Sequence, residues 1–129
     1  MIIFGFYGTG KTTVCKDTPG YLDLDFYDLL FSEDFGDINK AQDAYRAKVK
    51  AKSKKYDVVF INRYDPNISI DAAYIQGSYS DCIKDIRSRK QGNFIPDKEE
   101  YDAVKSILSK RVKTIFLKHG EHISEIGNF

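Results

Sequence analysis

The amino-acid sequence predicts an α/β protein of one domain (residues 1–129), with a mostly parallel five-stranded sheet covered by helices on both faces. Three observations predict this fold class. Short apolar segments alternate with segments of helical periodicity along most of the chain. Residues 56–62 (YDVVFIN) are largely β-branched and apolar, as the central strands of parallel sheets are. Residues 5–12 (GFYGTGKT) form a glycine-rich turn between a first strand and a first helix, at the sheet edge where α/β folds bind ligands.

The turn at residues 5–12 follows a short apolar strand at residues 1–4 and fits G-x-x-x-x-G-K-[ST], the phosphate-binding loop. Its glycines let the backbone adopt positive φ, so that successive amide groups can face an anion. Lys11 supplies a positive charge for β- and γ-phosphates, and the Thr12 hydroxyl can hold Mg²⁺. The motif predicts a triphosphate site formed by Gly8, Thr9, Gly10, Lys11, Thr12 and Thr13.

The next elements follow from periodicity and from helix-breaking residues. A helix at residues 11–17 is stopped by Thr-Pro-Gly at residues 18–20. A strand at residues 21–25 (YLDLD) then ends at Asp25. Residues 26–37 are acidic and aromatic, and the pattern leaves open a loop or an irregular helix. Residues 38–55 predict a helix, because apolar residues recur at spacings of three and four.

The second half of the chain continues the alternation. After the strand at residues 56–62 and a turn at residues 65–67, residues 70–77 predict a fourth strand. Ser78 or Ser80 caps a helix that ends near Gly92. A second helix begins at Asp97 with a capping-box pattern. Residues 114–117 form the last strand, and a short helix is predicted at residues 122–126.

Composition excludes several classes of protein. A net charge of +1 gives no overall attraction to nucleic acid, and no apolar segment approaches membrane-spanning length. The lysines at residues 40–55 spread around their helix and lack interleaved aromatic residues, a pattern that argues against a nucleic-acid surface. The two cysteines, Cys15 and Cys82, form no metal-ligand or redox motif. We expect a cytoplasmic protein without a signal peptide or a membrane association.

Four features together resemble the P-loop nucleoside and nucleotide kinases, in particular the small nucleotide-kinase-like proteins of bacteriophages. They are the loop at residues 5–12, Asp25 after the second strand, Asn62-Arg63 after the third, and the basic segment at residues 87–94 (RSRKQGNF). The resemblance implies a three-layer P-loop NTPase fold with strand order 2-3-1-4-5. It also implies ATP and Mg²⁺ as cofactors. The reaction would be transfer of the γ-phosphate to a nucleotide, such as a deoxynucleoside monophosphate, or to a nucleoside.

The resemblance also assigns roles to single residues. Residues 84–96 resemble the lid of such kinases, in which Arg87 and Arg89 would stabilise the migrating phosphoryl group; the alternative is a solvated basic helix end. Arg63 would hold phosphate and acceptor. Asp25 would contact the acceptor or, with Thr12, the metal; the alternative is a helix-capping aspartate. His119 would lie near the adenine, or else is a surface histidine.

Asn62 departs from the resemblance, because those kinases have an acid after the third strand. An asparagine cannot accept a proton as a carboxylate does, which favours a monophosphate acceptor or a transfer of the role to Asp25. It also permits a second function, a nucleotide-binding regulatory or interaction protein with weak or no turnover. The partner surface of that protein would consist of Phe26, Tyr27, Phe31 and Phe35. A motor-type or nucleic-acid-dependent NTPase is the least favoured alternative.

Overall fold

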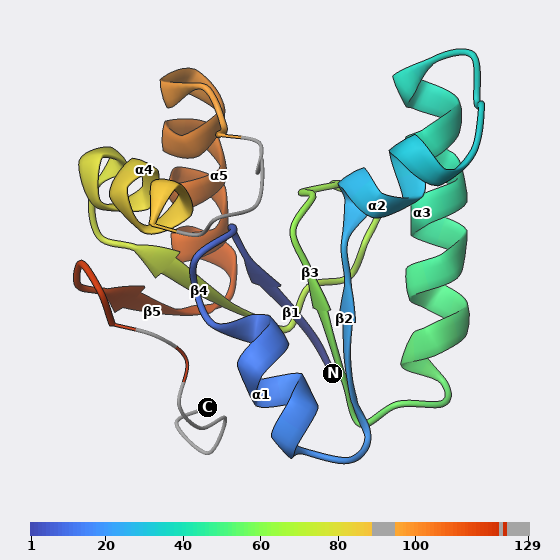
Figure 1. Ribbon diagram of the computed structural model, residues 1–129, viewed down its shortest axis with the longest axis horizontal. Helices are drawn as coiled ribbons and strands as arrows, with labels where there is room; N and C mark the ends of the chain where they lie inside the picture. Colours follow the sequence, from blue (N-terminus) through green and yellow to red (C-terminus); the bar gives the residue numbers. More distant parts are fainter. Residues whose placement is uncertain (89–94, 122, 124–129) are drawn as a thin grey trace.

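A parallel β-sheet organises the chain (Figure 1). The computed structural model describes residues 1–88, 95–121 and 123. The sheet has five strands in the order β2-β3-β1-β4-β5, and all four neighbouring pairs are parallel. The predicted order is therefore confirmed. The strands are β1 (Ile2–Gly5), β2 (Tyr21–Leu24), β3 (Val58–Ile61), β4 (Ala72–Gln76) and β5 (Lys113–Leu117).

The helices connect these strands on two sides of the sheet. In Figure 1, α1 lies in front of the sheet, α2 and α3 lie beside β2 and β3, and α4 and α5 lie beside β4 and β5. No helix in the described part of the chain is long and apolar enough to cross a membrane. The helices are α1 (Lys11–Asp17), α2 (Phe26–Ser32), α3 (Ile38–Ser53), α4 (Tyr79–Arg87) and α5 (Lys98–Arg111).

The core divides according to the two-residue period of the strands. Strand residues of one parity pack with side chains of α3, α4 and α5 in one cluster that includes Phe4, Val59, Ile61, Ala73, Ile75, Tyr45, Ile86 and Tyr101. Residues of the other parity pack with Val14 of α1 in a second cluster that includes Ile3, Val58, Phe60, Ala72, Tyr74 and Ile123. Both faces of β1, β3 and β4 are therefore buried, which explains why their sequences are continuously apolar.

Several predicted boundaries change in the structure. Residues 26–32 form a regular helix, α2, because the Asp25 side chain accepts hydrogen bonds from the amides of Tyr27 and Asp28. The predicted capping box at Asp97 is wrong: its side chain makes no cap hydrogen bond, and Glu100 is turned toward Arg63. The third strand is shorter than predicted, and α4, capped by Ser78, ends at Arg87. The helix predicted at residues 122–126 lies almost wholly outside the described residues.

An ion pair with a buried carboxylate joins α3 to the loop after β3. The Asp65 side chain is 1% exposed, and its oxygens accept hydrogen bonds from Arg46 Nε and the Asn67 amide, both at 2.8 Å. Burial alone would raise the pKa of Asp65. The Asn67 amide and the Arg46 guanidinium outweigh burial, and the pKa lies below its ordinary value.

We therefore expect Asp65→Asn to lower the free energy of unfolding by about 2 kcal/mol at pH 7, because the buried side chain loses its charge-assisted hydrogen bond to Arg46. Because the pKa of Asp65 is lowered by folding, its contribution is complete above about pH 4 and is lost as the pH falls further. Urea unfolding at pH 7 and pH 3 measures both effects. Asp43→Asn is the matched control, since Asp43 contacts the same Arg46 at 3.2 Å but is 72% exposed. Equal losses for the two variants would contradict the prediction.

Candidate functional site

Residues 5–12, called here the glycine loop, connect β1 to α1 at the carboxyl edge of the sheet. Gly8 and Gly10 have φ values of 86° and 89°, in the left-handed region that favours glycine. Gly8 also lies against α4. A Cβ atom at this position would be 2.8 Å from Cβ and 2.9 Å from the carbonyl carbon of Asp85. The loop is thus shaped by two positive-φ positions and held close to a neighbouring helix.

Lys11 lies inside the glycine loop and is only 5% exposed. Its Nζ donates hydrogen bonds to the carbonyl oxygens of Gly5 at 2.8 Å and Phe6 at 2.6 Å. The Thr9 hydroxyl donates to the same Phe6 carbonyl at 2.9 Å. The ammonium group is therefore fixed at the centre of the loop, where it can neutralise an anion bound by the loop.

Thr12 and Thr13 are exposed in the first turn of α1. The Thr12 hydroxyl donates to Asp23 Oδ2 at 2.9 Å. No motif in the sequence identifies Asp23 as a site residue, although the two-residue period of the strand indicates that its side chain faces α1. Asp23 has the same parity as Tyr21, which packs in the cluster that includes Val14 of α1. The carboxylate beside Thr12 is therefore that of Asp23, and not that of Asp25.

Asp25 contacts the glycine loop through a different residue. The Tyr7 hydroxyl donates to Asp25 Oδ2 at 2.5 Å, and the other oxygen, Oδ1, accepts from the amides of Tyr27 and Asp28. Burial raises the pKa of Tyr7, and the hydrogen bond to Asp25 and its charge raise it further. Tyr7 therefore stays protonated and acts as a donor. Asp25 therefore caps α2, which is the alternative role considered for it, and its other oxygen joins this cap to the glycine loop through Tyr7.

Three aspartates concentrate negative charge beside this contact. Asp23, Asp25 and Asp28 line a cavity of about 250 Å³ under α2 and α3, together with Lys48. Burial raises the pKa of Asp28, and the charges of Asp25 and Asp23 add to the effect. Among the described residues, no group of three or more His, Cys, Asp or Glu residues could hold a metal ion unaided.

The two residues after β3 are engaged in the fold. Asn62 is 8% exposed, and its Oδ1 accepts a hydrogen bond from the Phe26 amide at 2.9 Å. The Arg63 guanidinium lies 5.0 Å from the centre of the Phe26 ring. Its Nη2 is 3.2 Å from Gln42 Oε1, and its Nη1 is 4.0 Å from Glu100 Oε1. Asn62 thus supports the start of α2, and Arg63 bridges α3 and α5.

His119 follows β5 and is fixed close to the glycine loop. Its Nδ1 lies 2.8 Å from Asp85 Oδ1, which also accepts from the Gly120 amide at 3.1 Å. The Ile123 amide donates to the Thr9 carbonyl at 2.7 Å. Since Gly8 contacts Asp85, both Asp85 and Ile123 fasten this segment to the loop. Half of the His119 side chain remains exposed beside the site.

Arg87 is a candidate that the structure places away from the glycine loop. It lines a cavity between α4 and α5, with Lys84 on the same helix. Two residues along a helix turn the side chain through about 200°, so that Arg87 and Asp85 face opposite ways. Of the lid candidate (residues 84–96), residues 84–87 form the end of α4 and residues 95–96 precede α5. Arg89 lies outside the described residues.

No known family model matches the chain, and no curated protein matches its sequence. The chemistry of the site therefore rests on the residues and contacts described above.

Proposed function

We propose that this chain is a P-loop kinase of the three-layer NTPase fold, which uses ATP and Mg²⁺ to phosphorylate a nucleotide or a nucleoside. One observation carries the proposal. A loop of the G-x-x-x-x-G-K-[ST] type holds Lys11 at its centre, and the next residue, Thr12, is hydrogen-bonded to Asp23 at the carboxyl edge of a parallel sheet. This arrangement offers a cation for phosphate oxygens and two oxygen ligands for a metal ion.

Each group in the site has a defined task in phosphoryl transfer. The amides of the glycine loop and the ammonium of Lys11 would bind the β- and γ-phosphates and offset the charge of the transition state. Thr12 and Asp23 would hold Mg²⁺, directly or through water. When bound there, Mg²⁺ would further neutralise the phosphate oxygens. The segment at His119 borders the loop on the side of α4, where the nucleobase of ATP would lie.

The surroundings of Asp25 favour a monophosphate as the phosphate acceptor. Both carboxylate oxygens of Asp25 already accept hydrogen bonds from Tyr7 and the start of α2, which leaves little room for a substrate hydroxyl. Asn62 supplies no carboxylate either. A nucleoside hydroxyl benefits from a base, whereas the phosphate of a nucleoside monophosphate is already ionised. We therefore infer that a deoxynucleoside monophosphate is the better acceptor, because it needs no carboxylate base at Asp25 or at position 62.

Two measurements on the full chain test this function. Saturating ATP with Mg²⁺ should raise the free energy of unfolding by about 2.7 kcal/mol at a concentration of 100 Kd, and less when EDTA replaces Mg²⁺. Radiolabelled ATP should then transfer phosphate to at least one member of a panel of nucleoside monophosphates and nucleosides. Asp23→Asn should weaken the dependence on Mg²⁺, while Asp57→Asn, a change on the same sheet at the opposite strand ends, should not. An absence of stabilisation by ATP would refute the proposal.

A second function is favoured by Asn62, whose side chain is used to support α2. On this alternative the chain binds a nucleotide as a regulatory or interaction protein and turns over weakly or not at all. Stabilisation by ATP without transfer to any acceptor would identify it. The partner surface expected from the sequence needs a correction, because Phe26 is completely buried, whereas Phe31 is 67% exposed.

A further inference from the structure

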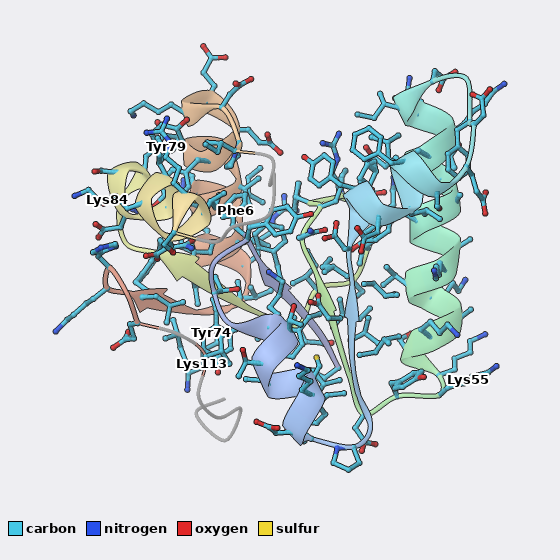
Figure 2. The ribbon with its side chains drawn as sticks, in the orientation of Figure 1. Phe6, Lys55, Tyr74, Tyr79, Lys84 and Lys113 are labelled. Atoms are coloured by element: carbon cyan, nitrogen blue, oxygen red, sulfur yellow. The ribbon has the colours of Figure 1, made fainter. Side chains whose placement is uncertain are left out.

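A second cavity, of about 650 Å³, lies between α4 and α5, beyond the carboxyl end of β4. Figure 2 shows Tyr79 at the start of α4 near α5, and Lys84 on the outer side of α4. Ser80, Lys84 and Arg87 line the cavity from α4, at the spacing that places them on one face of the helix. Asp85, which contacts Gly8 of the glycine loop, is not among the lining residues. The cavity is therefore separate from the glycine loop.

Positive charge dominates the lining of this cavity. Its charged members are one carboxylate, Asp102, and the four cations Lys84, Arg87, Lys98 and Lys105. Asp102 Oδ2 lies 2.7 Å from Lys98 Nζ, so that this carboxylate and one cation neutralise each other. In the described part of the chain, no ion pair involves Lys84 or Arg87. Lys84, Arg87 and Lys105 therefore have no ion-pair partner among the described residues.

The floor of the cavity is fixed by hydrogen bonds that lead away from it. The Tyr79 hydroxyl donates to the Pro96 carbonyl at 2.8 Å, and the Tyr101 hydroxyl donates to the carbonyl of the buried Gln76. The Lys105 ammonium donates to the Gly77 carbonyl at 2.7 Å and lies 5.5 Å from the centre of the Tyr101 ring. Two tyrosine rings and an anchored lysine thus form the base of the cavity, while Lys84 and Arg87 stand at its exposed side.

We propose that this cavity is a second binding site, for a small phosphate-bearing anion of high charge, such as a diphosphate or a phosphate ester. Arg87 offers a planar guanidinium that binds two phosphate oxygens at once, and Lys84 and Lys105 add point charges. The tyrosine rings give an organic group on the phosphate an apolar surface. A volume of about 650 Å³ is in the range of pockets that hold small organic ligands.

Inorganic pyrophosphate is the probe, and isothermal titration calorimetry at 150 mM salt is the measurement. All titrations use the full chain with the substitution Lys11→Met, which is expected to weaken anion binding by the glycine loop. We expect Lys84→Ala with Arg87→Ala to weaken pyrophosphate binding by at least about tenfold, because the double variant loses the charged hydrogen-bond donors that would hold the phosphate oxygens. The control pair, Lys40→Ala with Lys55→Ala, removes two exposed cations from α3 and the turn after it and should change affinity by less than about twofold.

Several outcomes would overturn the proposal. One is that binding of pyrophosphate cannot be detected. Another is that the two pairs of substitutions weaken pyrophosphate binding equally, which would mean that the anion responds only to the net charge of the chain. Citrate binding as tightly as pyrophosphate would overturn the assignment to phosphate. The unmutated chain provides an independent check by NMR: pyrophosphate should shift the amide signals of residues 77–80 and of Lys105 in addition to those of the glycine loop. Shifts confined to the glycine loop would also contradict the second site. These results do not depend on whether the chain transfers phosphate from ATP.

Discussion

Replacing Lys11 with methionine is expected to weaken ATP binding by about 10- to 100-fold, the effect of losing one charged hydrogen-bond donor worth about 1.5–3 kcal/mol. The rate of phosphoryl transfer should fall by a further factor of about 10², because this donor acts on charge that develops in the transition state. Methionine keeps most of the aliphatic length that fills the loop, where Lys11 is only 5% exposed. The loss of ATP affinity is therefore due to removal of the ammonium group, and not to a cavity left by a shorter side chain. Titration with ATP and a single-turnover assay measure the two effects separately.

The matched control is Lys16→Met, which removes one charge from the exposed side of the same helix, α1. It should change ATP affinity by less than about twofold at 150 mM salt, because exposed charges are screened there. Lys11→Met also removes one hydrogen-bond donor from the carbonyl group of Gly5 and one from that of Phe6, and the Phe6 carbonyl keeps its bond from the Thr9 hydroxyl. The free energy of unfolding in urea, measured without nucleotide, shows whether the loss of these hydrogen bonds destabilises the fold. Equal ATP affinity in the Lys11 variant and the unmutated chain would remove Lys11 from the site.

Most of the fold could be predicted, because the signals were local and repeated. The continuous apolar run at β3 indicated a strand buried on both faces, and the apolar stripe of α3 placed Tyr45 and Val49 in the core. The exception was α2. Its sequence is rich in aspartate and aromatic residues, and its start depends on Asp25 and on the Asn62 side chain, which follows β3 and is 36 residues from Phe26 in the sequence. Local propensity carries no information about such a contact.

The candidate site was predicted well where a motif specified the backbone and poorly where a side chain had to be chosen. The glycine loop has the positive φ values that its glycines indicated. The period of the strand could not separate Asp23 from Asp25, because the backbone of Asp25 is also extended; what separates them is that Asp25 bonds to Tyr7 and to the start of α2. Arg87 illustrates another limit. A basic segment of the sequence indicates that positive side chains are present. Which way the Arg87 side chain points depends on how α4 packs on α5.

The glycine loop also sets the second large expected effect. Gly8→Ala should lower the free energy of unfolding by about 3 kcal/mol, from two sources. Alanine at a φ of 86° costs about 1–2 kcal/mol. Its Cβ would also stand 2.8 Å from Cβ and 2.9 Å from the carbonyl carbon of Asp85, which cannot give way without moving the backbone of α4. Asp85 holds His119 and Gly120, so the displacement extends to the segment after β5.

Gly36→Ala separates the two sources of this loss. Gly36 has a φ of 78°, close to that of Gly8, but a Cβ atom there would meet nothing within 4 Å. Its cost should therefore be the conformational part alone, about 1 kcal/mol. The difference between the variants, measured by urea unfolding, isolates the contact of the loop with α4. Similar losses at both glycines would mean that this contact does not constrain the loop. A larger loss at Gly8, together with weaker ATP binding, would instead show that α4 holds the loop in the shape that binds phosphate.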